Sequence, residues 1–234
     1  MISKIVETII KYRSQMLVLK TQSRAQRGFT IGSSPMNSAL IVEECYREAK
    51  DNKIDFQLII LDAKAAFDTV VHSHMLRRVF LAGIDNRHWT LIKSLHENAK
   101  SSVRWDGNIS GPFNVNQGVR QGGILSSDLY NFFMNPLSDR LEGSGLGLKI
   151  GNISVSNTAC ADDIALISKI PYEAQTLVNM ITDFAFMEGY QLQPTKSVVR
   201  NVSSKKNHTY NRKSVVYKRF SVSNCGGAMR SYRK

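Results

Sequence analysis

The sequence contains few of the features that mark secreted or membrane proteins. Its three cysteines, Cys45, Cys160 and Cys225, are spaced neither as metal ligands nor as a disulfide framework. No apolar run approaches the roughly 20 residues that a membrane-spanning helix needs. Residues 1–20 form an amphipathic, lysine-bearing helix candidate without the apolar segment of a signal peptide. These absences predict an intracellular protein, in the cytoplasm or nucleus, that does not bind a membrane.

Acidic residues are absent from residue 189 to the C-terminus, where 11 lysines and arginines supply most of the net charge of +12. Residues 1–188 hold 20 basic and 19 acidic side chains and are therefore nearly neutral. The segment 201–234 is rich in Ser, Asn, Lys and Arg without sustained periodicity, which predicts a disordered tail that binds nucleic acid through its phosphates. The alternative is that this tail is not native domain sequence, as after a read-through or a frameshift.

The pattern of apolar residues predicts helices and strands in a chain large enough to bury one core. The turn residues 106–108 (Asp-Gly-Asn) separate two strand-like segments and indicate a hairpin. The expected helices are 37–50, one from about 72, 86–98, one containing 129–141, and 173–188 with a stop at Gly189; the expected strands are 56–61, 101–105, 109–115, one ending at 160 and one from 164. These elements predict an α+β fold with about four antiparallel strands backed by helices.

Two short stretches, a hundred residues apart, each place carboxylates at the end of an apolar strand-like run. The run 56–61 stops at Asp62, and Asp162 and Asp163 lie at the expected tip of a hairpin. Carboxylates are rarely left unpaired at the end of a core strand, and two or three together raise the pKa of at least one unless a cation neutralises them. Mg²⁺ prefers such oxygen ligands. The sequence therefore predicts metal-dependent phosphoryl transfer, with two ions binding the attacking and leaving oxygens.

Each stretch taken alone has a simpler explanation, because Asp-Asp is common in turns and an Asp before a helix is usually its N-cap. A third segment between them, QGVRQGGILSS at 117–127, favours a functional interpretation of the two stretches over the simpler one. Its glycines allow a ligand to approach the backbone closely, and Ser126 or Ser127 is expected to cap the following helix, whose first N–H groups favour anions. The plain alternative for this segment is a glycine-rich connection into a core helix.

The order of these segments resembles the palm of a reverse transcriptase. Asp62 and Phe67 form an Asp-x4-Phe motif, the QGVRQGG segment follows, and Ala-Asp-Asp comes at 161–163. Among reverse transcriptases, the order most resembles that of non-LTR (LINE-type) retrotransposon enzymes. The resemblance begins at 26–29, similar to the family's fingers motif Q-x-G-F, and ends at 189–197, similar to its segment G-x-x-x-N-x-x-K.

The resemblance implies a set of catalytic residues. Asp62 and Asp162 would bind two Mg²⁺ ions, for which Mn²⁺ could substitute, and Asp163 would be a weaker third carboxylate ligand. Lys196 would approach the pyrophosphate leaving group, as a general acid or as a charge on phosphate. The alternative for Lys196 is a solvated basic residue before a strand.

The resemblance also implies residues that bind substrate. Phe67 would be a steric gate, an aromatic face where a ribonucleotide 2′-OH would otherwise lie. Gln121 and Gly122 would line the pocket for nucleotide and template. The implied partners are an RNA template, a DNA primer and a dNTP, and the sequence leaves the oligomeric state open.

The sequence departs from the family at several positions. Cys160 replaces an aromatic residue, Gln193 replaces the Asn of the later segment, and 123–127 (GILSS) replaces Cys-Pro-Leu-Ser-Pro. None of these changes removes a predicted metal ligand. The histidines His72 and His74 follow the first motif closely, but we do not expect them to bind zinc.

We expect a reverse transcriptase domain at 1–200, with partial fingers at 1–54 and a palm at 55–200, and no thumb. The family activity is RNA-directed DNA polymerase, a nucleotidyltransferase, and this chain is short for a complete enzyme. The alternative is a truncated, catalytically inactive retroelement remnant that keeps the palm fold and binds nucleic acid non-specifically. A two-metal nuclease or phosphatase is disfavoured, because Phe67 and the Gln-Gly loop would have no purpose there.

Overall fold

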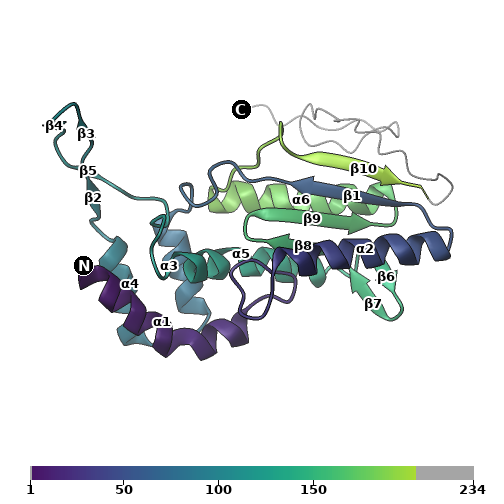
Figure 1. Cartoon of the computed structure of the whole chain (residues 1–234), viewed down its shortest axis with the longest axis horizontal. Coiled ribbons are helices and arrows are strands. Elements are labelled where there is room, and N and C mark those ends of the chain that lie inside the picture. Colours follow the sequence, from purple (N-terminus) through teal and green to yellow (C-terminus); the bar gives the residue numbers. More distant parts are fainter. Residues whose placement is uncertain (1, 204–234) are drawn as a thin grey trace. The chain divides into compact units, whose positions relative to one another are not determined.

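The computed structural model describes residues 2–203, which fall into two compact units (Figure 1). Unit 1 combines the chain up to Gln22 with Ala65–Asn135, and unit 2 combines Ser23–Lys64 with the chain from Pro136 onward. Each unit is therefore built from two separate stretches of sequence. None of the helices within 2–203 has the length and apolarity needed to cross a membrane.

Unit 1 consists of helices and a short-stranded hairpin. Its elements are α1 (Ile2–Thr21), α3 (His72–Leu81), α4 (Asn86–His96), β2 (Lys100–Ser101), β3 (Arg104–Trp105), β4 (Asn108–Ile109), β5 (Phe113–Asn114) and the beginning of α5 (Ser126–Glu142). Helix α3 confirms the helix predicted from about residue 72, and its Met75, Leu76 and Val79 recur at helical spacing and are buried. Asp85 caps α4 by accepting a hydrogen bond from the Arg87 N–H at 3.0 Å.

The hairpin predicted around Asp106-Gly107 is present in unit 1. Asp106 and Gly107 both have positive φ, 46° and 76°, which is the backbone of a tight type I′ turn. The paired strands are shorter than expected, two residues each, since every residue from 101 to 110 is exposed and no buried face extends the pairing. The predicted hairpin is thus confirmed, and its predicted length is wrong.

Unit 2 contains a four-stranded, fully antiparallel sheet in the order β10-β1-β9-β8. Its elements are α2 (Pro35–Asp51), β1 (Phe56–Leu61), the end of α5, β6 (Leu148–Ile150), β7 (Ile153–Val155), β8 (Asn157–Cys160), β9 (Asp163–Ser168), α6 (Pro171–Glu188) and β10 (Val198–Val202). The predicted α+β fold, helices and sheet of four antiparallel strands, is confirmed.

The inner strand β9 is buried on both faces. Leu166 and Ile167 point to opposite sides of the sheet and both are fully buried. Ile167 joins a core cluster with Cys45 and Ala49 of α2. Helix α6 contacts β9 and β1 and buries Leu177 among other apolar side chains. Helices therefore cover the sheet and fix its strands in place (Figure 1).

Two predictions concern the C-terminal part of unit 2: the end of a helix at Gly189 and the start of a disordered tail at residue 201. Gly189 adopts φ 72° directly after α6, so its predicted role as the helix stop is confirmed. Strand β10 runs to Val202, so the first two residues of the predicted tail, 201 and 202, belong to a strand. The rest of the predicted disordered tail, 204–234, lies outside the described residues, and the division into fingers and palm at residue 54 stays a prediction.

Candidate active site

The carboxylates predicted to bind metal lie in unit 2, at one end of the two inner strands. β1 ends directly before Asp62, and β9 begins at Asp163. Leu61 pairs with Ile164, so the antiparallel register sets Asp62 level with Asp163 across the two strands. Asp162 lies in the turn between β8 and β9, whereas Asp163 is the first residue of β9 and not part of the tip. The fold thus brings two stretches, a hundred residues apart, to one sheet end.

The other two aspartates act on the ionisation of Asp163. Partial burial and the nearby charges of Asp162 and Asp62 raise the pKa of the Asp163 carboxyl, and Lys196 acts in the opposite direction. The aspartates and Lys196 therefore form one electrostatic group. Such a group is stabilised by a cation that neutralises the acids.

Lys196 is brought to Asp62 by the segment before β10. The Asp62 carbonyl accepts a hydrogen bond from the Gln193 N–H at 2.8 Å, and the Asp62 N–H donates to Ser197 Oγ at 3.4 Å. Lys196 Nζ then lies 3.6 Å from Asp62 Oδ2 while its side chain remains 69% exposed. Asp62 Oδ2 is buried and accepts no hydrogen bond within the described chain. The structure therefore places Lys196 beside the first predicted ligand and in contact with solvent.

This donor set fits a hard divalent cation. Asp62 Oδ2 is a buried carboxylate oxygen without a hydrogen bond, and two further carboxylates share its electrostatic environment. Within residues 2–203, no group of three or more His, Cys, Asp or Glu side chains is arranged so that it could hold a metal ion by itself. Mg²⁺ does not require one, because it is usually held by one or two carboxylates together with substrate phosphates.

Gln26 of the predicted fingers motif fixes the turn that carries Asp162. Its side chain is 1% exposed, and its Oε1 accepts hydrogen bonds from the N–H of Gly28 at 2.7 Å and of Ala161 at 2.9 Å. Its Nε2 donates to the Ala161 carbonyl at 3.0 Å. Both polar backbone groups of Ala161, which has φ 60°, are therefore held by one amide side chain. The motif was recognised in the sequence by resemblance alone, which gave no hint of this contact.

Gly28 allows this close approach. A Cβ at Gly28 would lie 2.1 Å from the Ala161 nitrogen, so only glycine leaves room for the turn. The Arg27 N–H donates to the Ala159 carbonyl at 2.7 Å and adds a strand-like contact beside it. The segment 26–28 therefore supports the acidic turn directly.

The residues predicted to bind substrate lie in unit 1. Phe67 is half-buried and stacks on Tyr130, with ring centroids 4.6 Å apart and an interplanar angle of 12°. Its carbonyl accepts a hydrogen bond from the Val119 N–H at 2.8 Å, which ties it to the glycine-rich loop. In that loop, Gln121 and Gly122 are exposed, and Gln121 Nε2 donates to Asp68 Oδ1 at 3.1 Å. Sequence reasoning missed Tyr130, which looked like an ordinary core residue of the following helix.

A cavity of about 360 Å³ opens beside the loop in unit 1. Its lining includes Asp68, Arg120 and Gln121 together with two imidazoles, His72 and His96. The two rings meet edge to face at 5.1 Å, and the His72 Nε2 lies 2.8 Å from the Gly118 carbonyl. Burial lowers the pKa of His96, so this imidazole is neutral near pH 7.

The expected cap of the helix after the loop is wrong. Helix α5 begins at Ser126, so Ser126 and Ser127 both lie inside it. The Ser126 hydroxyl donates to the Arg120 carbonyl at 2.6 Å and closes the loop on itself. The N–H groups of Ile124 and Leu125 instead donate to the carboxylate of Glu7 in α1.

Comparison with known proteins identifies relatives over most of the chain. Residues 1–217 match the family model of "Reverse transcriptase (RNA-dependent DNA polymerase)". A Pol polyprotein of retrotransposable element R2 from Popillia japonica is 26% identical over 182 residues, which cover 77% of this chain and 26% of the relative. The R2DM polyprotein of Drosophila melanogaster is 29% identical over 171 residues, 73% of this chain and 16% of the relative. This chain therefore spans about a quarter or less of these relatives.

Solved structures show the same fold. Apo telomerase from Candida tropicalis, truncated from its C-terminal domain, superposes with a TM-score of 0.65 at 16% identity, over 86% of this chain and 41% of that one.

A further sequence relative is the RNA-directed DNA polymerase of mobile element jockey from Drosophila funebris, which is 32% identical over 122 residues, 52% of this chain and 13% of the relative. The chain therefore belongs to the reverse transcriptase (RNA-dependent DNA polymerase) family, with relatives in non-LTR retrotransposons, as its motifs predicted.

Proposed function

We propose that this chain is the catalytic domain of a non-LTR retrotransposon polymerase, which transfers a nucleotidyl group from a dNTP to a DNA primer on an RNA template. The observation that carries the proposal is the meeting of Asp62, Asp162 and Asp163 at one sheet end in a member of this family. The primer 3′-hydroxyl loses its proton to solvent and its oxygen bonds to the α-phosphorus, the bond from that phosphorus to the bridging oxygen breaks, and pyrophosphate leaves. Such a reaction needs alignment and charge neutralisation more than covalent chemistry.

The residues of unit 2 divide this work. Asp62 and Asp162 would hold Mg²⁺ or Mn²⁺, which neutralises charge on the reacting phosphate when bound, and Asp163 would be the third carboxylate. Lys196 reaches from Asp62 into solvent and would place its ammonium on the leaving pyrophosphate. Gln26 would keep the Asp162 turn in position through the Ala161 backbone.

In unit 1, the proposed roles concern the choice of substrate. Phe67 is fixed by its stack on Tyr130, which supports a rigid face against a ribose 2′-OH. Gln121 and Gly122 are exposed on the loop and would contact the nucleotide and template. The thiols of Cys45 and Cys160 are free, which supports a reducing compartment, cytoplasm or nucleus, as the place of this activity.

The test is single-nucleotide addition to a DNA primer annealed to RNA, with the full chain in excess and Mg²⁺ present. Asp62→Asn and Asp162→Asn should each lower the rate about a hundredfold or more, because both remove charge that balances the transition state. Asp183→Asn, an exposed change on α6, is the matched control and should retain the wild-type rate. Equal rates in Asp162→Asn and wild type would refute the proposed site. A folded wild-type chain that binds nucleic acid but adds no nucleotide would favour the inactive remnant instead.

A further inference from the structure

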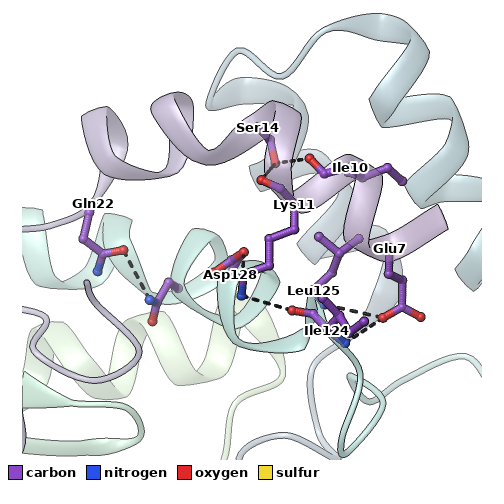
Figure 2. Close-up of polar contacts among 9 residues, drawn as sticks. Glu7, Ile10, Lys11, Ser14, Gln22, Ile124, Leu125 and Asp128 are labelled. Atoms are coloured by element: carbon purple, nitrogen blue, oxygen red, sulfur yellow. Dashed lines mark hydrogen bonds and ion pairs between the residues drawn. The ribbon is translucent and has the colours of Figure 1, made fainter. Parts of the chain in front are cut away.

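In unit 1, a buried carboxylate of α1, that of Glu7, binds the glycine-rich loop, which we define as residues 118–125. Glu7 is 6% exposed, and its Oε2 accepts hydrogen bonds from the N–H of Ile124 at 2.7 Å and of Leu125 at 3.5 Å (Figure 2). Its Oε1 lies 3.8 Å from the Arg120 guanidinium at the start of the same loop. One carboxylate therefore contacts both ends of the segment 120–125.

Lys11 completes the attachment from the next turn of α1. Its Nζ donates to the Ile124 carbonyl at 3.2 Å and lies 3.4 Å from Asp128 Oδ2 in α5. Glu7 and Lys11 are four residues apart and thus share one face of the helix, from which both side chains point to the loop (Figure 2). Both polar backbone groups of Ile124 are therefore bound by side chains of α1.

These contacts explain why a charge is buried at this point. A buried carboxylate is strongly unfavourable unless charged or polar partners surround it. The N–H groups before α5 point at Glu7, at the end of a helix where the dipole favours negative charge. Gly123 lies close to both Glu7 and Ser126, since a Cβ there would be 3.4 Å from Glu7 Oε2 and 2.4 Å from Ser126 Oγ. The loop is shaped around this carboxylate.

Between the two fixed ends of the loop lie Gln121 and Gly122. Gly122 is exposed and has φ 76°, a left-handed conformation that favours glycine. We propose that Glu7 and Lys11 are positioning residues, which hold this loop in the shape that presents Gln121 and Gly122 to the incoming nucleotide. The inference rests on the proposed function of the loop. Small errors in such alignment are costly for the reaction, because correct orientation supplies much of its acceleration.

Hydrogen exchange at the Ile124 amide tests the attachment in the full chain. In Glu7→Ala this amide should exchange about tenfold to a hundredfold faster, the loss expected for a hydrogen bond to a charged acceptor. Glu7→Gln keeps an acceptor without the charge and should restore part of the protection. Gln15→Ala, exposed on the same helix, should exchange like wild type. Unchanged Ile124 exchange in Glu7→Ala would overturn the attachment. If Glu7→Ala does not fold, Lys11→Met tests the second contact, because it removes the hydrogen bond to the Ile124 carbonyl and leaves the one from the Ile124 N–H to Glu7. Ile124 exchange should then rise less than expected for Glu7→Ala, and unchanged exchange would overturn the attachment through Lys11.

Nucleotide addition then tests the positioning role. Glu7→Ala should raise the KM for dNTP about tenfold while the rate at saturation changes less, since the loop is loosened and the carboxylate site in unit 2 is intact. A merely structural loss would reduce the amount of active protein and leave KM unchanged. Faster Ile124 exchange with an unchanged KM would overturn the positioning role. If wild type adds no nucleotide, the proposed function fails, while the exchange data still support or overturn the attachment of the loop to α1.

Discussion

At the scale of single residues, we expect Phe67 to decide which sugar the proposed site accepts. Its ring is held by Tyr130 at 4.6 Å, so it presents a fixed shape and no hydrogen bond. Phe67→Val should leave dNTP addition largely intact and lower discrimination against ribonucleotides by about tenfold to two-hundredfold, the range for a change of pocket shape. The measurement is kcat/KM for a dNTP and for the matching rNTP. Phe186→Val, at a side chain 91% exposed on α6, is the control. Parallel loss with both nucleotides would show that Phe67 only packs.

We expect His96 to make the stability of the protein depend on pH. Burial is the main cause that lowers its pKa; His72 and Arg120 lower it further, while the Ile92 carbonyl and Glu7 oppose them. An unfolded histidine takes up a proton below about pH 6.5, while the folded one does not until lower pH. The free energy of unfolding should therefore fall as the pH drops from about 7 to 5 and level off below the folded pKa.

Urea unfolding across this pH range measures that slope. His96→Gln cannot take up a proton, so its free energy of unfolding should fall less steeply than that of wild type. A slope equal to that of wild type would assign the pH dependence to other groups.

At the scale of elements, the segment 26–28 and the β8–β9 turn act as one piece. Gly28→Ala would place a Cβ 2.1 Å from the Ala161 nitrogen, so the turn must move. We expect a loss of stability of about 1–3 kcal/mol, as for overpacking, together with loss of nucleotide addition, because Asp162 moves with the turn. Gly111→Ala is the control, since its Cβ would meet nothing within 4 Å. Unfolding in urea with wild-type stability would mean that the turn accommodates the methyl group.

Local patterns predicted the elements well and their attachments poorly. The apolar run of β1 and the glycine stop of α6 follow from neighbouring residues, so the sequence alone was enough to find them. The cap of α5 could not be predicted in this way. Local rules point to Ser126 or Ser127, but both lie inside the helix, and the N–H groups just before it donate to Glu7, 117 residues from Ile124 in sequence. A contact of that kind exists only after the chain has folded.

In the candidate site, too, the residues that follow from local patterns were predicted and those defined by long-range contacts were not. Asp62, Asp162 and Asp163 were predicted because strand-end carboxylates are unusual, and the β1–β9 register brings them together. The roles of Gln26 and Tyr130 were not predicted, since a buried amide and a buried ring look like core residues in a sequence. Their functional meaning comes from what they touch, Ala161 in one case and Phe67 in the other.

At the scale of the whole molecule, the fold is kept although most residues differ. The structural likeness to telomerase extends over 86% of the chain at 16% identity. Substitution is tolerated where a position requires only an apolar side chain of suitable volume. Positions such as Gly28 or Gln26 have stricter requirements, since space or two backbone hydrogen bonds depend on one residue type. This contrast explains why short motifs identified the family while most of the sequence did not.

Over the whole chain, the net positive charge is concentrated at the C-terminal end: residues 1–188 are nearly neutral, and 11 basic side chains follow them. Binding to single-stranded RNA should therefore come largely from the C-terminal segment and weaken steeply with salt. Four substitutions in the full chain test this: Lys205→Gln, Lys206→Gln, Arg212→Gln and Lys213→Gln. With four basic side chains removed, binding neutralises fewer phosphates and releases fewer counterions from the RNA. The dissociation constant at low salt should therefore rise about tenfold or more, and its dependence on salt should become shallower. The control changes an equal number of exposed lysines in unit 2 to Gln: Lys50, Lys53, Lys149 and Lys169. If the control weakens binding as much as the C-terminal changes do, the body of the domain, and not the basic segment, attracts the nucleic acid.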